Sequence, residues 1–537
     1  MTDGQAKSLN STISPNVVGL KGRWYFNHIF FILTLAIFCF LFLWHLESPG
    51  LNYDELLWTN PILPNGDGQT FITYSFQGIP IMLMPYIGAL KTYLFLPVSK
   101  IFGFTVSSIR GFALIEAISI LILVYVFTLR NISKRVAIVA VGLLAINTTF
   151  LYQTKTDYGP VNLMFILQMF LLFFIINFTK TQKSSSLVGI VAVSLLGFFD
   201  KFNFLWIIFS SIMASLLIYR QEVKNLIATH KKNVWLIFVI FISTGIVGYK
   251  LIRFLFTFFN IPDRALLFEK LQLLTTTINN DDFYFMVFHR VYSFPKILFY
   301  FYVSVIIIGL TLALIKKIKI NKIAIFLLIM TFFTILQILL TKNATGAHHL
   351  MTIFPAFYIT VAYFMWTIID SCKVNFYLRG AVIIIFTSAL VLQFLILLNF
   401  EKTLMRGESQ NPAWSQKIYA LSNDIIKEEE QSDIYFLDWG IYTQALTLTG
   451  SKRLKDFTWI FNAPVRDEKT MAEIYKTYFA SKNALVIMHP PEKTIFHASR
   501  INFFKFIASK NIKLEKLKPN YDPRSSTYEI YRITPQI

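Results

Sequence analysis

Long apolar runs alternate with short polar segments over roughly the first 400 residues of the chain. The first run covers about 26–46 and is long enough for a helix to cross a bilayer. Another run, about 187–218, is broken once by Asp200-Lys201, which indicates a helical hairpin. Counting all the runs predicts eleven membrane-spanning helices. The later spans are expected near 234–255, 294–315, 323–341, 350–369 and 380–399. The predicted fold class is therefore a polytopic α-helical membrane protein.

Two stretches depart from this alternation of long apolar runs and short polar segments. The stretch 79–97 contains three prolines and Lys91, a pattern that predicts short helices lying at the membrane interface rather than one crossing. Residues 260–290 are more polar and are expected to form a long loop between spans.

From residue 401 onward the composition becomes that of a soluble domain. Helical periodicity over 415–430 and 496–510 alternates with strand-like runs, which predicts a small α/β domain. The expected strands lie at 433–438, 484–488, 513–517 and 527–533. The chain is thus divided into a cytoplasmic tail (1–24), a membrane domain (25–400) and a C-terminal α/β domain (401–537).

Composition and charge restrict the class of protein and predict its orientation in the membrane. The chain is 55% hydrophobic, which excludes an ordinary soluble protein. The formal net charge of +20 does not indicate nucleic-acid binding, because the basic residues form short clusters between apolar spans. Those clusters fall on alternate loops, so the positive-inside rule places the N-terminus in the cytoplasm and the C-terminal domain outside, in a plasma (inner) membrane protein. The two cysteines, Cys39 and Cys372, lie at different levels and predict no disulfide.

The unusual polar groups converge on the outer face. Next to Lys91, these groups are Asp54, Glu55, Lys155, Asp157, Asp200, Lys201, His348 and His349. An enzyme on this side has no nucleotide sugars, so its activated donors arrive on lipids, typically as a sugar on a polyprenyl phosphate. Such a transfer needs a base for the acceptor hydroxyl and cations for the departing phosphate.

Each group also has a purely structural interpretation. Asp54 and Glu55 could face water in an ordinary loop, and Lys91 could extend to the lipid headgroups. Lys155 is more simply explained as the ion-pair partner of Asp157. Lys201 could be neutralised by Asp200. The two histidines are adjacent and are expected to point in different directions, which makes them weak metal ligands.

Together these stretches resemble the GT-C superfamily of membrane glycosyltransferases, in its family-39-type branch. That branch includes protein O-mannosyltransferases and the aminoarabinose transferases that modify lipid A. The matching stretches are Tyr53-Asp-Glu55, Lys91–Gly103 with Ser108-Ile-Arg110, Phe150–Asp157, Gly197–Phe202 and, more weakly, Ala347–Pro355. The family often has His or Lys followed by Pro-Pro where this chain has Lys91-Thr-Tyr, and the C-terminal domain matches no known motif.

The resemblance implies an inverting glycosyltransferase that uses a polyprenyl-phosphate-linked sugar and acts on a lipid, glycan or protein acceptor. It implies Asp54 as the catalytic base, with Glu55 orienting it or helping to hold a divalent cation. The implied phosphate-binding residues are Lys91, Lys201, His348 and His349, and the implied organising residues are Lys155, Asp157 and Asp200. Whether a divalent cation is required is left open.

Two other classes compete with this interpretation. A lipid or ion transporter would carry intramembrane charges near the midplane and often shows repeated halves. Here the charges gather at one face and no repeat is visible. A non-catalytic membrane scaffold that presents the outer domain would tolerate the loss of Asp54.

Overall fold

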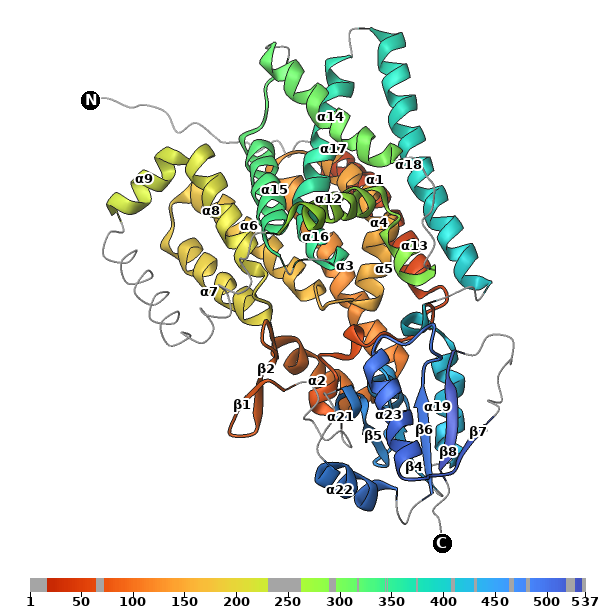
Figure 1. Ribbon diagram of the computed structural model, residues 1–537. Coiled ribbons are helices and arrows are strands. Elements are labelled where there is room, and N and C mark those ends of the chain that lie inside the picture. Colours follow the sequence, from red (N-terminus) through yellow and green to blue (C-terminus); the bar gives the residue numbers. More distant parts are fainter. Residues whose placement is uncertain are drawn as a thin grey trace, which may run out of the picture.

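A helical bundle stands on a smaller mixed α/β unit in the computed structural model (Figure 1). The residues that the structure describes are 17–63, 72–229, 262–288, 296–315, 318–342, 344, 346–372, 375–406, 411–428, 432–462, 468–479, 483–517 and 527–533. The span expected at 234–255 and most of the N-terminal tail lie outside these residues.

The bundle contains helices that are long and apolar enough to cross a membrane. Among the described residues these are α3 (Val106–Asn131), α6 (Asn162–Thr181), α14 (Ile297–Leu314), α15 (Lys322–Leu340), the continuous segment Ala347–Ser371 and α18 (Phe376–Met405). That segment comprises α16 (Ala347–Leu350), η3 (Met351–Ile353) and α17 (Phe354–Ser371). The polytopic membrane fold is thus confirmed.

Other apolar helices are shorter or bent. α4 (Lys134–Ala145) and α5 (Thr148–Thr156) are together long and apolar enough for one span, and the chain bends by 67° between them. Asn147 causes the restart, because its side chain accepts a hydrogen bond from the Phe150 amide at 2.7 Å and caps α5. α1 (Val17–Leu43) has a shorter apolar part, His28–Leu43. α7 (Ser184–Asp200) and α8 (Phe204–Ile218) form a hairpin of two short apolar helices, and the polar helix α9 (Arg220–Thr229) follows it. The count of eleven spans stays a prediction.

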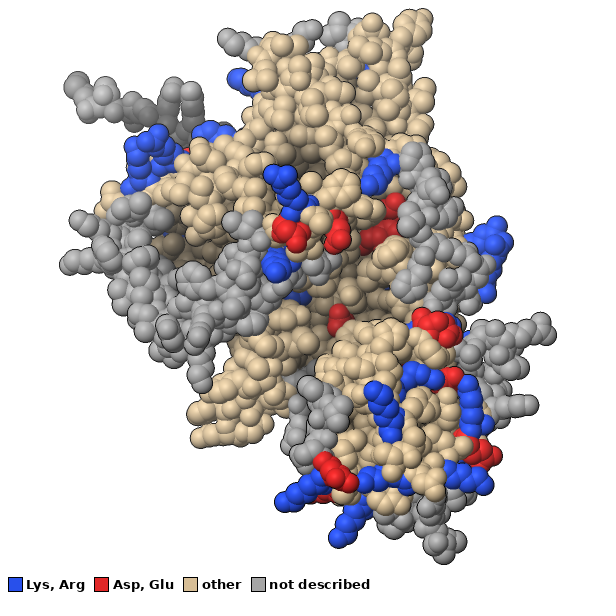
Figure 2. Space-filling view, viewed as in Figure 1, with Lys and Arg blue, Asp and Glu red and all other residues tan. Residues whose placement is uncertain are grey.

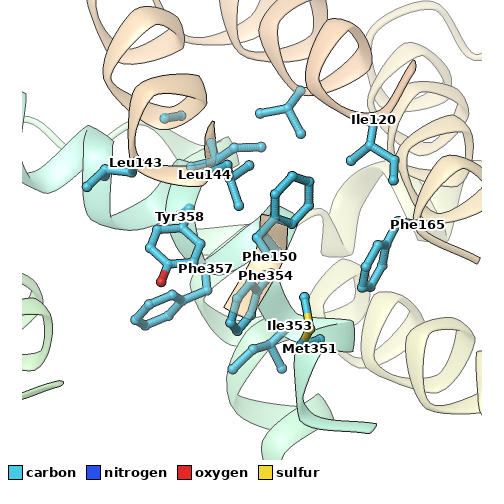
Figure 3. Packing of buried hydrophobic residues seen from close by; sticks show 14 of the residues in the cluster. Ile120, Leu143, Leu144, Phe150, Phe165, Met351, Ile353, Phe354, Phe357 and Tyr358 are labelled. Atoms are coloured by element: carbon cyan, nitrogen blue, oxygen red, sulfur yellow. The ribbon is translucent and has the colours of Figure 1, made fainter. Parts of the chain in front are cut away.

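Aromatic and aliphatic side chains fill the centre of the bundle. Phe150 of α5 lies among Ile120, Phe165, Phe354 and other buried residues (Figure 3). This core fixes α5, and with it the polar turn that follows α5. The expected boundary between domains, at residue 401, lies inside α18.

Two expectations for the irregular stretches were wrong. Residues 79–88 form strands, because Gln77 and Gly78 both adopt positive φ and turn β1 (Tyr74–Phe76) into β2 (Ile79–Met84). β3 (Ile87–Gly88) completes this antiparallel sheet, and only α2 (Leu90–Phe102) is helical. Within 260–290, α12 (Arg264–Asn279) and α13 (Asp282–Phe288) replace the expected loop. Asp263 caps α12 by accepting from the Leu266 amide at 2.8 Å.

The C-terminal unit is a mixed five-stranded sheet in the order β5-β4-β6-β8-β7. β4 (Asp433–Phe436), β6 (Ala484–Met488), β7 (Leu514–Leu517) and β8 (Glu529–Ile533) match the expected strands, and β5 (Leu454–Asp456) is additional. α19 (Lys417–Glu428) and α23 (His497–Ser509) match the expected helices. The sequence did not predict α20 (Ile441–Thr449), α21 (Thr458–Asn462) or α22 (Glu468–Tyr478). Short turns η1 (Asp54–Leu56), η2 (Asn60–Ile62) and η4 (Pro412–Trp414) lie near the junction.

Charged side chains gather on this C-terminal unit and are few over the upper part of the bundle (Figure 2). This distribution agrees with a lipid-embedded bundle and a solvated domain.

Gly88 allows β3 to pack directly against the end of α7. A Cβ atom there would lie 1.8 Å from the Phe199 carbonyl oxygen, which is a backbone atom that cannot rotate away. We therefore predict that Gly88→Ala destabilises the protein by about 1–3 kcal/mol, as overpacking does. A lower melting temperature in detergent would show this. Gly111→Ala is the matched control, since nothing lies within 4 Å of its Cβ position. Equal melting of the two variants would contradict the prediction.

Candidate functional site

The turn that carries Asp54 is held by local hydrogen bonds. The Asn52 side-chain oxygen accepts from the Asp54 amide at 2.9 Å, and the Glu55 Oε2 atom accepts from the Asn52 amide at 3.2 Å. Asn at this position competes well for nearby backbone groups and so favours such a turn. The turn presents Asp54 at the junction of the bundle and the C-terminal unit.

Glu55 forms a salt bridge with Arg110 of α3. The Arg110 Nε atom lies 2.6 Å from Glu55 Oε1, and the Nη2 atom lies 2.9 Å from Oε2. Arg110 also donates to the Leu46 carbonyl. Glu55 and Arg110 are both almost completely buried. Because this pairing is bidentate, it fixes the position of the acidic turn on α3 and neutralises Glu55.

Lys91 of α2 is enclosed by two carboxylates. Its Nζ atom lies 2.5 Å from Glu116 Oε2 and also forms an ion pair with Asp157 Oδ2. The Trp58 ring centroid is 4.5 Å from the same nitrogen. Lys91 is only 2% exposed, so the interpretation that it extends to the headgroups was wrong. The cation instead joins α2, α3 and the turn after α5.

Asp157 itself shapes the turn between α5 and α6. It adopts φ 42°, and its Oδ1 atom accepts from the amides of Val161 and Asn162, both at 2.9 Å. The pairing of Lys155 with Asp157 was therefore wrong. Lys155 donates to the carbonyls of Trp44 and His45, each at 3.0 Å. Side chains two positions apart on a helix end do not face each other, which explains this separation.

Lys201 lies at the break of the α7–α8 hairpin. It is 1% exposed, and it donates to the Gly159 carbonyl. Residue 201 also forms an isolated antiparallel bridge with Ile87, which ties the hairpin to β3. Asp200 is buried beside it, within electrostatic reach of Lys91 and Lys201.

The surroundings of Asp54 shift the pKa of its carboxyl group. Burial raises the pKa of Asp54 to about 6, and the positive charge of Lys201 opposes this rise. Burial and the Asp54 charge together raise the pKa of Tyr86 to about 12 and raise that of Tyr158 further. Lys201, Tyr86 and Tyr158 therefore interact electrostatically with the Asp54 carboxylate.

The two histidines lie together, contrary to the expectation that they diverge. Their ring centroids are 4.0 Å apart. His349 Nδ1 is 2.6 Å from the Asn203 side-chain nitrogen, and the His348 ring packs edge-on against Tyr158 at 5.1 Å. Gly159 has φ +65° and makes room for this packing, since a Cβ there would lie 2.6 Å from the His348 ring. Both histidines thus lie beside the Lys201–Gly159 contact.

The structure brings in residues that the sequence did not single out for the site. Arg110 and Asn52 fix the acidic turn, Asn203 contacts His349, and Glu116 shares Lys91. Glu116 could have been found, because a lone carboxylate inside an apolar span is costly and points to a partner.

The described residues do not form a cage for a metal ion. No group of three or more His, Cys, Asp or Glu side chains among them converges in a way that could hold one. Glu55, the acidic neighbour of Asp54, has both carboxylate oxygens bound to Arg110.

Comparison with solved structures places this arrangement on a known fold. ArnT from Cupriavidus metallidurans in the apo state is similar with a TM-score of 0.60 and 10% identity, over 96% of this chain and 98% of that chain. The same protein bound to undecaprenyl phosphate gives a TM-score of 0.56 and 11% identity, over 94% and 98%. The apo oligosaccharyltransferase of Archaeoglobus fulgidus gives 0.51 and 12% identity, over 87% and 70%.

By sequence, no protein-family model and no curated relative matches the chain. The structural similarity shows a shared fold. It confirms the predicted fold, because the chain shares the fold of the ArnT and oligosaccharyltransferase structures.

The Glu55–Arg110 pair generates a stability prediction. Arg110→Met leaves the Glu55 charge buried without a partner and should cost about 3–5 kcal/mol. Thermal unfolding in detergent measures this loss. The double variant Glu55→Gln/Arg110→Met should recover part of the stability, because no buried charge remains.

Arg532→Met is the matched control for that experiment. Arg532 pairs with Glu428 at 3.3 Å, but both side chains are more than a third exposed. Removing this exposed pair should cost about 0–1 kcal/mol. A similar loss in both arginine variants would contradict the role given to the buried pair.

Proposed function

We propose that this protein is an inverting glycosyltransferase that takes its sugar from a polyprenyl-phosphate carrier. The observation that carries the proposal is the state of Asp54. Among the acidic side chains gathered here, Glu55, Glu116, Asp157 and Asp200 are buried, whereas Asp54 is partly exposed. It has no salt bridge among the described residues, and it lies within the electrostatic influence of Lys201. A reachable carboxylate beside a cation suits a base that acts next to a departing phosphate.

The proposed reaction uses the Asp54 carboxylate and the Lys201 cation. Asp54 takes the proton of the acceptor hydroxyl as its oxygen attacks the anomeric carbon of the donor sugar. The bond from that carbon to the phosphate oxygen breaks, and the lipid phosphate leaves with the bonding electrons. Lys201 stabilises the charge that develops on the phosphate. Attack from the side opposite the leaving group inverts the anomeric configuration.

The carrier class is supported by the similar structures. ArnT has been solved bound to undecaprenyl phosphate on the same fold. The chemistry also needs no strong acid, since the phosphate is already a good leaving group. His348, His349 and Lys201 lie close together and form the proposed phosphate-binding group. For Lys91, its two carboxylate partners favour an organising role with Asp157 and Lys155.

A divalent cation stays an expectation. Two of the buried carboxylates gathered near Asp54 have cationic partners, Glu55 with Arg110 and Asp157 with Lys91. The described residues therefore do not fit a resident metal ion, and the proposed reaction contains no step that depends on one.

The proposed orientation places the site on the outer face of the membrane. The basic clusters on alternate loops support a cytoplasmic N-terminus and an outer C-terminal domain.

Transfer activity tests the role of Asp54. Asp54→Asn keeps the size of the side chain and removes its charge, so we expect it to lower transfer of labelled sugar from a polyprenyl-phosphate donor mixture by about 10²–10⁴-fold, the usual contribution of a general base. The assay uses membranes with matched expression. Glu515→Gln, an exposed carboxylate on β7, is the control and should leave transfer unchanged. Equal transfer by Asp54→Asn and wild type would refute the base.

The pKa of Asp54 gives a pH prediction. Only the ionised carboxylate accepts a proton, and its pKa is raised from 3.8 to about 6. The value of kcat/KM should therefore fall about tenfold per pH unit below that pKa and become level above it. A profile that stays flat down to pH 5 would show that another group acts as the base.

A further inference from the structure

A pocket of about 410 Å³ opens between the last turns of α3 and α6. Both helices are long and apolar enough to cross a membrane, so their ends lie near a membrane surface. Both ends lead into basic loops that the positive-inside rule places in the cytoplasm. Arg110, which holds the acidic turn, is near the other end of α3, about 30 Å away along the helix. The pocket is therefore separate from the candidate functional site.

The α6 wall of the pocket changes in character along the helix. Phe173 and Phe174 come first, Asn177 follows about one turn later, and Lys180 lies at the end. Because a helix rises 1.5 Å per residue, the apolar and cationic ends of this wall are about 10 Å apart. A membrane lipid has the matching order, with its phosphate at the surface, then its ester groups, and then its acyl chains.

The mouth of the pocket is cationic. Arg130 of α3 and Lys180 of α6 line it, and no carboxylate is among the described residues of the lining. Lys180 donates to the side-chain oxygen of Asn131 at 2.6 Å, which is a neutral partner. Within the described part of the chain, neither cation forms a salt bridge. An anion placed between the two would therefore gain charge-assisted hydrogen bonds from both.

A purely structural role explains only part of this arrangement. Cations in the last turn of a helix offset the partial negative charge of the helix end, which accounts for the positions of Arg130 and Lys180. It does not account for the hollow between them or for the aromatic wall below them.

The walls of the pocket are held by contacts with neighbouring helices. The Phe173 ring packs edge-on against the buried Phe127 ring of α3, with the centroids 5.2 Å apart. The Asn177 side-chain nitrogen donates to Ser186 Oγ of α7 at 2.7 Å. The pocket thus exists before a ligand binds, as most small-molecule sites do.

We propose that this pocket binds the headgroup of an anionic phospholipid. The lipid phosphate lies between Arg130 and Lys180, and one acyl chain runs along Phe173 and Phe174. Basic pockets between membrane helices on the cytoplasmic side are suited to such headgroups. A free phosphate would leave the aromatic wall unused, which favours a lipid as the occupant.

The bound lipid joins α3 to α6 at the end opposite the candidate functional site. At the other end, α3 carries Arg110 and Glu116, and α6 begins at the turn that Asp157 caps. The lipid therefore stabilises the relative position of two helices that hold the site. This inference does not depend on the proposed function.

Native mass spectrometry of the purified full chain tests the proposal. The protein is freed of lipid in detergent and titrated with phosphatidylglycerol or with phosphatidylcholine of the same acyl chains. Phosphatidylglycerol should bind about tenfold more tightly, because choline neutralises the phosphate of the other lipid. Inorganic phosphate at millimolar concentration should not displace the bound phosphatidylglycerol.

Three double variants locate the binding. Arg130→Gln/Lys180→Gln should lower the affinity for phosphatidylglycerol about tenfold, to the level of phosphatidylcholine. Arg130→Lys/Lys180→Arg keeps both charges and should retain the binding. Arg220→Gln/Lys224→Gln is the matched control, since it removes two exposed charges of α9 outside the pocket and should change nothing.

Four results would overturn the proposal. These are equal affinity for the two lipids, unchanged phosphatidylglycerol binding after the glutamine changes at 130 and 180, an equal loss in the α9 control, and displacement by inorganic phosphate. The last result would assign the pocket to a free anion. Because the assay contains no donor sugar, a failure of the proposed glycosyltransferase activity would leave these outcomes unaffected.

Discussion

The buried cation of Lys91 is the interaction on which the rest of the site depends. A lysine that is removed from water must be compensated, and here Glu116 and Asp157 do so from two different parts of the bundle. This requirement fixes α2 against α3 and holds the turn after α5 in place. Asp157 then caps the start of α6 with its other oxygen. One ion-pair cluster therefore sets the positions of the segments that surround Asp54.

The second charged pair plays a complementary part. Arg110 neutralises Glu55, which leaves Asp54 as the partly exposed carboxylate of the adjacent two. Adjacent acids that look equivalent in the sequence thus have different roles. One fixes the turn to α3, and the other interacts electrostatically with Lys201, Tyr86 and Tyr158. The division follows from their partners, because neither residue type nor spacing distinguishes them.

Much of the fold and part of the candidate site could be predicted from the sequence. The membrane fold and the strands β4, β6, β7 and β8 follow from apolar periodicity, and the breaks at Asp54, Asp157 and Lys201 mark where polar groups interrupt it. The partners could not be predicted, since Lys91 and Asp157 are 66 residues apart. Glu116 is recognisable as a lone carboxylate in an apolar span, but the sequence does not identify Lys91 as its partner. The strands at 79–88 were missed because their prolines suggested broken helices, whereas the Gln77-Gly78 turn decides the local structure.

The proposed mechanism is a direct displacement at the anomeric carbon with Asp54 as the base. The anomeric configuration of the product tests it most directly. Purified protein would be given a polyprenyl-phosphate sugar of known configuration, and the new glycosidic linkage would be assigned from its proton coupling constant before any isomerisation. A direct displacement gives an inverted linkage. A retained linkage would mean two successive displacements through a covalent intermediate and would contradict it.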